Sequence, residues 1–343
     1  MSERLEDIAK AMMAEGKGIL AADESGGTIK KRFETIGVES TEESRRAYRE
    51  MLFTAEEAMK NHISGVILYE ETLYQSTKDG RRFVDVIKAA GAVPGIKVDK
   101  GAKPLALFPG EKVTEGLDGL RERLKAYYDQ GARFAKWRAV IDIGAGLPTE
   151  TAIHCNAHAL GRYAALCQEA GIVPIVEPEV LMDGPNATHD IDRCYAVSAA
   201  ALKRLFQELA AMRVSLAGTV LKPNMVIAGK DCPKQAPPEE VAAKTVKCLK
   251  ENVPAEVAGI AFLSGGQSDE VATHHLSLIN RGGEIPWPLT FSYGRALQAA
   301  AIKTWHGRPE NVGAAQKAFL HRAHMNALAA KGRYSPEDER DAA

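Results

Sequence analysis

The chain alternates short apolar segments with longer segments of helical character, and this alternation constrains its fold more than any other feature. Each apolar segment ends in polar or charged residues and is followed by a segment with a helical pattern. The eight apolar segments cover residues 18–24, 65–70, 94–100, 133–138, 173–179, 219–225, 259–266 and 289–295.

The intervening segments predict helices, among them residues 41–60, 117–128 and the alanine-rich region 187–212. Eight strands alternating with crossover helices are typical of a (β/α)8 TIM barrel of the α/β class. A single barrel domain accounts for residues 1–334, including an N-terminal helical extension, and leaves 335–343 as a flexible polar tail. The alternative is an open doubly wound sheet, which is less favoured because no G-x-G-x-x-G follows the first strand.

The balance of charge argues against a nucleic-acid or membrane partner. The 343 residues include 44 Lys and Arg and 45 Asp and Glu, which are interspersed and give a formal net charge of −1. The first residues are partly acidic and contain no apolar stretch typical of a signal peptide. Five widely spaced cysteines without a C-x-x-C pair indicate reduced thiols. We therefore predict a cytoplasmic protein whose anion binding is local.

Polar residues recur at the carboxyl ends of the predicted strands, where (β/α)8 barrels carry their active sites. They are Asp23, Lys97 with Asp99, Lys136 with Arg138, Glu177 with Glu179, Lys222, Ser264-Gly265-Gly266 and Arg295. Side chains two residues apart on a strand point to the same face, so the Lys136/Arg138 and Glu177/Glu179 pairs can each converge. A solvated strand end explains any one of these residues. Unpaired inward charges are costly, so a shared polar site explains all of them better.

Lys222 is the strongest candidate for an amine nucleophile. It lies in the apolar run T-V-L-K-P-N-M, where burial would lower its pKa from the value of about 10.4 that a lysine has in water. A neutral amine attacks a carbonyl to form an imine, while carboxylates move the protons. The simpler interpretation is a lysine whose stem covers apolar surface. Lys136, beside Trp137, is the rival nucleophile, and if it stays protonated, its charge would lower the pKa of Lys222 further.

A pair of histidines has the spacing of a metal site. His154 and His158 lie at i, i+4 in H-C-N-A-H within a predicted helix, and such a pair can hold zinc. No glutamate follows the first histidine, and the sequence identifies no third ligand, so a pair on the helix surface is the favoured interpretation. We predict no metal site and no cofactor.

Two groups of residues are predicted to bind anions. Gly265 and Gly266 follow an apolar strand and precede a helix start at 267–270, which gives a backbone-amide cradle suited to phosphate. Arg295 adds a planar, bidentate donor. The second group consists of Ser25, Thr28, Arg32 and Lys97. The simpler interpretations are a glycine turn for the first group and a helix cap for S-G-G-T in the second.

A set of motifs runs along most of the chain. It consists of L-A-A-D-E-S, S-T-E-E-S-R-R, G-V-I-L-Y-E-E-T-L-Y-Q, G-I-K-V-D-K-G, F-A-K-W-R, G-I-V-P-I-V-E-P-E, L-K-P-N-M-V, F-L-S-G-G-Q-S and T-F-S-Y-G-R-A-L-Q-A. Over residues 16–334, this set closely resembles class I fructose-bisphosphate aldolase. The resemblance implies a metal-independent lyase without cofactor. Such an enzyme reversibly cleaves fructose 1,6-bisphosphate into dihydroxyacetone phosphate and glyceraldehyde 3-phosphate, in glycolysis and gluconeogenesis.

The resemblance also implies a role for each candidate residue. Lys222 would form the Schiff base, Glu177 would accept and donate the proton beside it, and Asp23 would assist carbon–carbon cleavage. Glu179 and Lys136 would support the charge network. The C1 phosphate would meet Ser264, Gly265, Gly266, Ser292, Gly294 and Arg295. The C6 phosphate would meet Ser25, Thr28, Arg32 and Lys97, and Arg138 is counted with these substrate-binding residues. Thr28 replaces a serine that is usual in animal members and keeps the hydroxyl.

The chain departs from the animal members of the family at its C-terminus. Those proteins end in a tyrosine on a mobile tail that is implicated in proton exchange at the enamine, whereas the last tyrosine here is Tyr334. We therefore expect deletion of residues 335–343 to change kcat by less than about threefold. The family commonly forms tetramers, so a homotetramer is expected from the resemblance alone.

Two alternative functions stay open at the level of sequence. One is a non-catalytic barrel that binds sugar phosphates or a protein partner, and the presence of Lys222, Glu177 and Asp23 together argues against it. The other is a Schiff-base lyase or transaldolase that acts on another phosphorylated ketose, and two separate anion sites favour a bisphosphate. Preference between fructose 1,6-bisphosphate and fructose 1-phosphate stays open.

Overall fold

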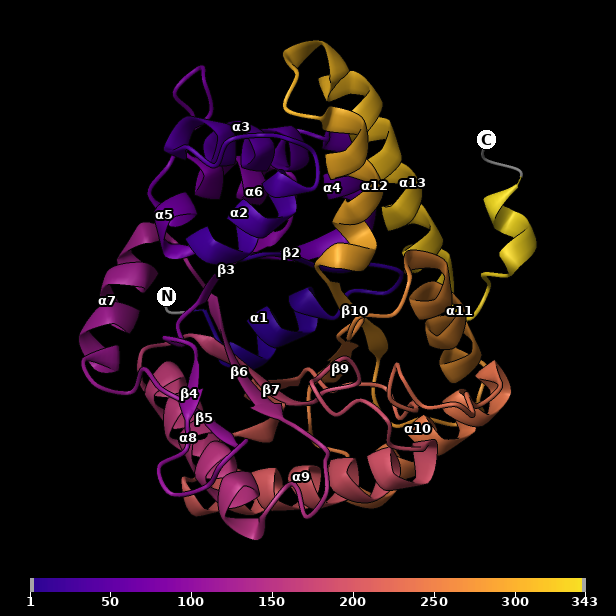
Figure 1. Ribbon diagram of the computed structural model, residues 1–343. Helices are drawn as coiled ribbons and strands as arrows, with labels where there is room; N and C mark the ends of the chain where they lie inside the picture. Colours follow the sequence, from indigo (N-terminus) through magenta and orange to yellow (C-terminus); the bar gives the residue numbers. More distant parts are fainter. Residues whose placement is uncertain (1–2, 341–343) are drawn as a thin grey trace.

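A closed barrel of parallel strands forms the centre of the molecule (Figure 1). The computed structural model describes residues 3–340. Around the barrel, the strands follow the order β1-β10-β9-β8-β7-β6-β3-β2. Their bounds are β1 Gly18–Ala22, β2 Ile63–Leu68, β3 Val93–Lys97, β6 Phe134–Ile141, β7 Val173–Val180, β8 Val220–Leu221, β9 Gly259–Phe262 and β10 Leu289–Tyr293. Each predicted apolar segment supplies one strand, which confirms the single-domain (β/α)8 prediction.

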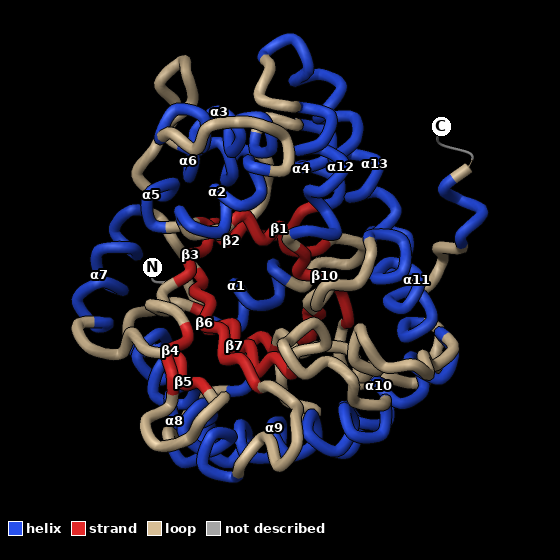
Figure 2. Tube along the Cα trace, viewed as in Figure 1, coloured by secondary structure: helices blue, strands red, loops and turns tan. Residues whose placement is uncertain are grey.

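Helices surround the barrel, as Figure 2 shows in blue around the red strands. They are α2 Gly26–Glu34, α3 Glu42–Phe53, α4 Glu56–His62, α5 Glu70–Leu73, α6 Phe83–Ala89, α7 Leu120–Gln130, α8 Glu150–Glu169, α9 Ile191–Ala211, α10 Pro238–Asn252, α11 Asp269–Asn280, α12 Arg295–Trp305 and α13 Val312–Ala330. The part of the chain that the structure describes also contains the short 3-10 helices η1 Leu216–Gly218, η2 Pro309–Asn311 and η3 Pro336–Glu339. One large apolar cluster fills the layer between the strands and these helices.

One further helix, α1 (Leu5–Met12), closes the amino-terminal end of the barrel. Its buried side chains Ile8 and Met12 share an apolar cluster with strand residues that include Phe134, Ile175 and Val220. Burying a side chain of this size contributes about 1.5–3 kcal/mol. This end of the barrel is therefore filled with apolar side chains, and polar chemistry is left to the carboxyl ends of the strands.

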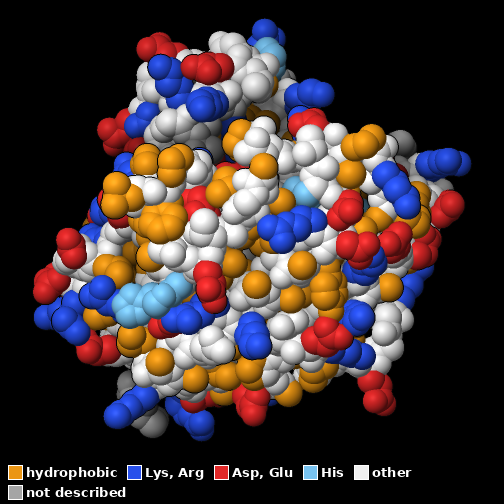
Figure 3. All heavy atoms as spheres, turned by 60° about the horizontal axis from the view of Figure 1, so that its bottom comes forward, with side chains coloured by type: hydrophobic (Ala, Val, Ile, Leu, Met, Phe, Trp, Pro, Cys, Tyr) orange, Lys and Arg blue, Asp and Glu red, His pale blue; other side chains and the backbone are white. Residues whose placement is uncertain are grey.

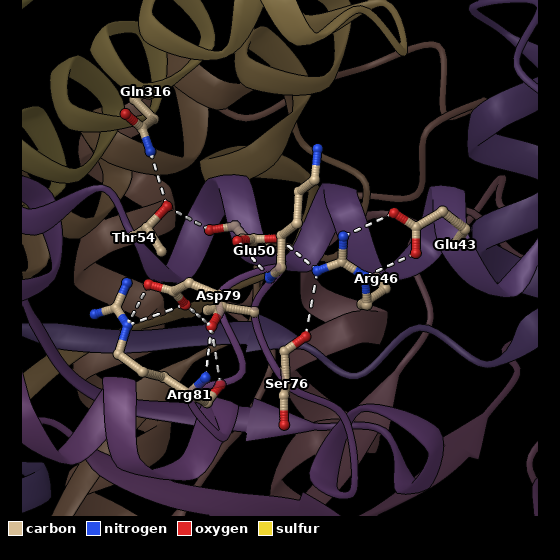
Figure 4. Close-up of polar contacts among 10 residues, drawn as sticks. Glu43, Arg46, Glu50, Thr54, Ser76, Asp79, Arg81 and Gln316 are labelled. Carbon is tan, nitrogen blue, oxygen red and sulfur yellow. Dashed lines mark hydrogen bonds and ion pairs between the residues drawn. The ribbon is translucent and has the colours of Figure 1, made fainter.

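The predicted helix 41–60 is wrong as a single element, because α3 ends at Phe53 and α4 begins at Glu56. At the break, the Thr54 hydroxyl donates to the carbonyl of Glu50 (2.7 Å) and accepts from the amide of Gln316 on α13 (3.1 Å). Figure 4 shows this junction, together with Arg46 between Glu43 and Glu50. A threonine that bonds its own preceding turn competes with the helical backbone ladder, which explains the end of α3 here.

Two other predictions differ from the structure. The predicted strand 219–225 is only two residues long, because Pro223 has no N–H for a ladder bond. The Asn224 side chain instead accepts from the backbone N–H of Val180 (3.0 Å), so it replaces a ladder contact between β8 and β7. The antiparallel pair β4 (Ala102–Pro104) and β5 (Lys112–Thr114) was not predicted, since three-residue strands carry little periodic signal.

Candidate active site

The carboxyl ends of the strands surround a cavity of about 1170 Å³. Nearly every polar residue predicted for the site lines this cavity. These residues are Asp23, Ser25, Thr28, Arg32, Lys97, Lys136, Arg138, Glu177, Glu179, Lys222, Ser264, Gly265, Ser292, Gly294 and Arg295. Gly266 and Asp99, which were also expected at this end of the barrel, do not line it. The predicted convergence of strand ends thus produces one polar chamber large enough for a sugar phosphate.

Alternation along the strands explains why these side chains meet. On β6, Phe134 belongs to the apolar cluster that also contains the buried side chains of α1. Lys136, two residues later, lines the cavity. On β7, Ile175 and Glu177 repeat the same change from apolar to charged. After β8, the Lys222 N–H still donates to the carbonyl of Val176 (2.9 Å), which holds the lysine backbone against β7.

Two buried lysines share one buried carboxylate. Lys222 Nζ lies 3.2 Å from Glu177 Oε1, and Lys136 Nζ lies 3.4 Å from Glu177 Oε2. Lys136 Nζ is also 2.7 Å from Asp23 Oδ2. Side-chain exposure is 5% or less for both lysines and Glu177, and 12% for Asp23. Among residues 3–340, Lys136 thus contacts two carboxylates and Lys222 contacts one.

This difference sets the protonation of the two lysines. Burial lowers the pKa of Lys222, and the nearby charge of Lys136 lowers it further, against the opposing effect of Glu177. Burial also disfavours the charge of Lys136, but the Asp23 and Glu177 carboxylates outweigh it and raise the pKa of Lys136 above its ordinary value. Lys136 is therefore a fixed cation, and Lys222 is the lysine closer to the neutral amine.

The carboxylates of the site are held in their charged form. Burial alone would raise the pKa of Asp23, but Lys136 and Lys222 lower it. The pKa of Glu177 is likewise lowered by Lys136 and Lys222 against the effect of burial. Glu177 Oε2 is buried and accepts no hydrogen bond from any residue in the described range 3–340. Its contact with Lys136 Nζ, at 3.4 Å, is an ion pair without hydrogen-bond geometry, so this buried, charged oxygen is still suited to accept a proton from a bound molecule.

A second ion pair, between Arg138 and Glu179, also lines the cavity. Arg138 pairs with Glu179 on the neighbouring strand. The backbone N–H of Arg138 also donates to Asp99 Oδ2 (3.3 Å). Glu179 is buried, whereas the Arg138 side chain is 42% exposed, so the guanidinium faces the open part of the cavity.

The glycine pair predicted to cradle phosphate adopts the backbone that only glycine tolerates well. Gly265 has φ 58° and Gly266 φ 83°. A Cβ on Gly266 would lie 2.5 Å from Asp183 Oδ2, so a side chain there would also displace the Asp183 carboxylate from Arg295. The Ser292 hydroxyl is buried and has no hydrogen-bond partner among residues 3–340. This unpaired hydroxyl and the adjacent glycine turn leave donors available to an anion.

Arg295 begins α12, where free backbone N–H groups favour negative charge. Its guanidinium lies 3.2 Å from Asp183 Oδ2 and is 57% exposed. The arginine is therefore oriented by a carboxylate at the edge of the predicted C1 phosphate site. Asp183 was not predicted, because nothing in its loop sequence distinguishes it from an ordinary solvated residue.

The second predicted anion site lies at the start of α2. The Ser25 hydroxyl is 3.1 Å from that of Thr28, and Ser25 makes no side-chain capping bond to α2. Arg32 pairs with Glu24 (2.5 Å). Lys97 Nζ lies 3.4 Å from Asp99 Oδ1. The hydroxyls are thus not engaged in capping the helix, which was the simpler interpretation of S-G-G-T.

Glu24 and Arg49 support this second site and were not predicted. Arg49 is buried and donates to Glu24 Oε2 (3.1 Å) and to the carbonyls of Glu24 and Ala22 (3.0 and 3.2 Å). Glu24 in turn holds Arg32. The position of Glu24 beside Asp23 was an available signal. Arg49 gave none, because an arginine within a helical pattern is usually exposed.

Tyr334 lies outside the cavity and is buried beneath the C-terminal segment. Its hydroxyl donates to Glu339 Oε1 (3.0 Å), and Glu339 also pairs with Arg322 (2.5 Å) and His321 (2.7 Å) of α13. Residues 335–340 therefore carry specific contacts. Residues 341–343 lie outside the described residues, and the flexibility of the 335–343 tail stays a prediction.

These contacts predict that the tail contributes to stability. Glu339→Gln should lower the free energy of unfolding by about 3 kcal/mol, because the Arg322 side chain is only 5% exposed and would lose its carboxylate. Denaturant unfolding measures the change, and Glu337→Gln, on the same 3-10 helix, is the matched control. A stability equal to that of the parent protein would mean that the Glu339 contacts contribute nothing.

The structure also describes the state of the cysteines and the hydrophobicity of the helices. All five cysteines are free, and Cys167, Cys194, Cys232 and Cys248 are buried. Among residues 3–340, no helix is long and apolar enough to cross a lipid bilayer.

Comparisons with known proteins identify the family. The family described as fructose-bisphosphate aldolase class-I matches residues 4–343. A probable fructose-bisphosphate aldolase class 1 of Xanthomonas axonopodis pv. citri is 57% identical over 333 residues, which cover 97% of this chain and 98% of that protein. Fructose-bisphosphate aldolase 4, cytosolic, of Arabidopsis thaliana is 57% identical over 320 residues, or 93% and 80% of the two chains.

The fold agrees with this result. A ternary co-crystal structure of fructose-bisphosphate aldolase from Plasmodium falciparum, in complex with TRAP and a small-molecule inhibitor, has a TM-score of 0.93 and 48% identity. The match covers 96% of this chain and 95% of that chain. The chain belongs to the class I fructose-bisphosphate aldolase family and is an enzyme, which confirms the resemblance found in its motifs.

Proposed function

We propose that this enzyme cleaves fructose 1,6-bisphosphate reversibly into dihydroxyacetone phosphate and glyceraldehyde 3-phosphate through an imine on Lys222. The observation that carries the proposal is the shared Glu177. This carboxylate lies between a lysine whose pKa is lowered and a lysine whose pKa is raised. One lysine thereby becomes available as a nucleophile, and the other stays a cation that stabilises the charges around it.

The first half of the reaction uses Lys222 and Glu177. The neutral amine of Lys222 attacks the C2 carbonyl of the substrate and forms a carbinolamine. Glu177, 3.2 Å from Lys222 Nζ, takes a proton from the attacking nitrogen and passes it to the C2 oxygen, which gives the neutral carbinolamine. A second proton, taken up from solvent and delivered by Glu177, lets the hydroxyl leave as water, and a cationic iminium forms. The iminium is an electron sink, and the charge of Lys136 keeps the adjacent carboxylates ionised.

Asp23 supports the bond-breaking step. When the C4 hydroxyl loses its proton to a carboxylate of the site, the C3–C4 bond breaks and its electrons pass to the iminium, which gives an enamine and releases glyceraldehyde 3-phosphate. Asp23 lies next to Lys136 on the wall of the cavity and assists this step. Protonation at C3 and hydrolysis of the imine then release dihydroxyacetone phosphate and restore Lys222.

The two anion sites support a bisphosphate substrate. Ser264, Ser292 and Arg295, with the glycine turn, bind the C1 phosphate, and Ser25, Thr28, Arg32 and Lys97 bind the C6 phosphate. Both groups line the same cavity as Lys222. A ketose with two phosphates satisfies both groups, whereas fructose 1-phosphate leaves the second group empty.

A coupled cleavage assay on fructose 1,6-bisphosphate and fructose 1-phosphate, with and without EDTA, tests this proposal. We expect cleavage of the bisphosphate at a rate that EDTA does not change, because lysine chemistry supplies the electron sink. Loss of turnover in EDTA that zinc restores would contradict the proposal, and so would activity on neither ketose.

Mutations in the two predicted phosphate sites should affect the two substrates differently. Arg295→Ala should raise KM for both ketoses, because it removes a charge-assisted contact worth about 1.5–3 kcal/mol to the phosphate that both carry. Lys97→Ala should impair the bisphosphate more than fructose 1-phosphate. The measurement is kcat/KM for each substrate. Equal losses on the two substrates for Lys97→Ala would show that the second site is assigned wrongly.

A cytoplasmic homotetramer is a further part of the proposal. Its support is membership in the family and the relative named as cytosolic in Arabidopsis thaliana. Light scattering during size-exclusion chromatography tests the assembly, and a mass of one or two chains would contradict it.

A further inference from the structure

The helix layer outside the barrel brings together three metal-ligating side chains that the active site does not use. His154 and His158 extend from α8, and Glu208 extends from α9. Glu208 Oε1 lies 3.4 Å from His154 Nε2, and Glu208 Oε2 lies 3.2 Å from His158 Nδ1. One donor atom from each of the three residues falls within 4.8 Å of the others. None of the three lines the cavity at the strand ends.

The helices approach closely at this point because of a glycine. A Cβ on Gly161, one turn after His158, would lie 3.1 Å from the carbonyl oxygen of Glu208, so a larger residue would push α8 and α9 apart. Only 10% of the Glu208 side chain is exposed, whereas the two histidines are about half exposed, at 53% and 43%. The carboxylate is thus fixed at the floor of the cluster, and the imidazoles are free to turn toward an ion.

Figure 3 brings forward the lower side of the molecule in Figure 1, where α8 and α9 lie, and histidine side chains reach the surface on this face. The exposed fractions of His154 and His158 show that the cluster is open to solvent. An ion could enter without any movement of the barrel.

The donors and their spacing suit a divalent transition metal. Zinc binds imidazole nitrogen and carboxylate oxygen at about 2.0–2.2 Å, so two donors of a tetrahedral site are about 3.4 Å apart. The His154–Oε1 and His158–Oε2 separations of 3.4 and 3.2 Å are close to this value, although each involves a different oxygen of Glu208. Rotation of the exposed imidazoles would bring both histidines to one ion, since the donor atoms already lie within 4.8 Å of one another. Two imidazoles and one carboxylate leave a fourth position for water.

Arg204 competes with a metal for the carboxylate. Its Nη2 lies 2.6 Å and its Nε 3.0 Å from Glu208 Oε1. Glu208 Oε2, in contrast, contacts only His158 among the hydrogen-bond and ion-pair partners in residues 3–340. An ion bound through Oε2 could leave the Arg204 contact to Oε1 in place, but the charge of the guanidinium would oppose the bound cation and weaken its binding.

We propose that His154, His158 and Glu208 form a binding site for a divalent transition-metal ion, represented by Zn²⁺, that links α8 to α9 outside the active site. The ion connects the helices that follow β6 and β7, the two strands that carry Lys136 and Glu177. Its role is to stabilise the fold. It takes no part in the imine chemistry, so the proposal does not depend on the proposed function.

Titration calorimetry of the full chain, after removal of metals with a chelator, tests the site with ZnCl₂. We expect one Zn²⁺ per chain and a higher melting temperature in its presence. His158→Asn and Glu208→Gln should each weaken binding by at least about tenfold, because each removes one of three protein ligands. Co²⁺ should give the absorption of a tetrahedral site in the parent protein and lose it in both variants.

A matched control comes from a second His–Glu–Arg group. His321 lies beside Glu339 and Arg322, as His158 lies beside Glu208 and Arg204, but within residues 3–340 this group has no second histidine at metal-ligand distance. His321→Asn should leave the Zn²⁺ affinity unchanged. Arg204→Met should tighten Zn²⁺ binding, because it removes the cation that shares the carboxylate. Absence of saturable binding, or binding that both ligand variants leave unchanged, would overturn the proposal, as would loss of binding in His321→Asn or no tightening in Arg204→Met.

Discussion

Replacing Lys222 by Met should reduce turnover of fructose 1,6-bisphosphate by roughly 10⁴-fold or more, the scale of loss when a covalent nucleophile is removed. The Met side chain fills similar space but cannot form an imine. Lys136 cannot substitute for Lys222, because its contacts with Asp23 and Glu177 keep it protonated. Steady-state cleavage kinetics measure the loss.

The control for this variant is Lys250→Met, which changes an exposed lysine on α10 and should keep full activity. Circular dichroism should show that Lys222→Met is folded. A folded Lys222→Met protein that retained a tenth or more of the parent activity would mean that another residue supplies the amine.

Replacing Lys136 by Met should have the second largest effect, with kcat at neutral pH lower by about 10²–10³-fold. The charge of Lys136 helps to lower the pKa of Lys222, so its removal raises that pKa and leaves less free amine at neutral pH. The rise of the rate with increasing pH should therefore move to higher pH. Asp23 also loses its partner, and a buried unpaired carboxylate should destabilise the fold by about 3–5 kcal/mol.

The Lys136→Arg variant is the control, because it keeps the positive charge at position 136 but changes the shape of the side chain. The guanidinium keeps the positive charge beside Asp23, so the pH dependence of the rate should stay close to that of the parent protein even if kcat falls. Two results would contradict the account. One is a Lys136→Met profile with an unchanged midpoint, and the other is a Lys136→Arg profile that shifts as far as that of Lys136→Met.

The fold was predictable from sequence because each barrel strand carries a strong local signal. Inward positions such as Phe134, Lys136 and Arg138 change from apolar to charged along one strand, and this change locates both the core and the site. The exact ends of helices and strands were less predictable, because single side chains can interrupt the backbone hydrogen-bond pattern. The hydroxyl of Thr54 ends a helix that the apolar pattern would continue, and Pro223 ends a strand after two ladder residues.

The missed residues act through partners that are distant in sequence. Arg49 reaches Glu24 across 25 positions, and Glu208 meets His158 across 50. Local periodicity reports which face a residue occupies, but it does not report which residue of another element faces it. The third member of the His154/His158 cluster therefore became visible only when α8 and α9 were placed together.

Reductive trapping tests the central claim most directly. The enzyme is mixed with dihydroxyacetone phosphate and sodium borohydride, which reduces an imine to a stable secondary amine, and the modified peptide is identified by mass spectrometry. We predict a single adduct on Lys222, because burial and the charge of Lys136 lower its pKa. An adduct on Lys136, or inactivation without any lysine adduct, would contradict the assignment.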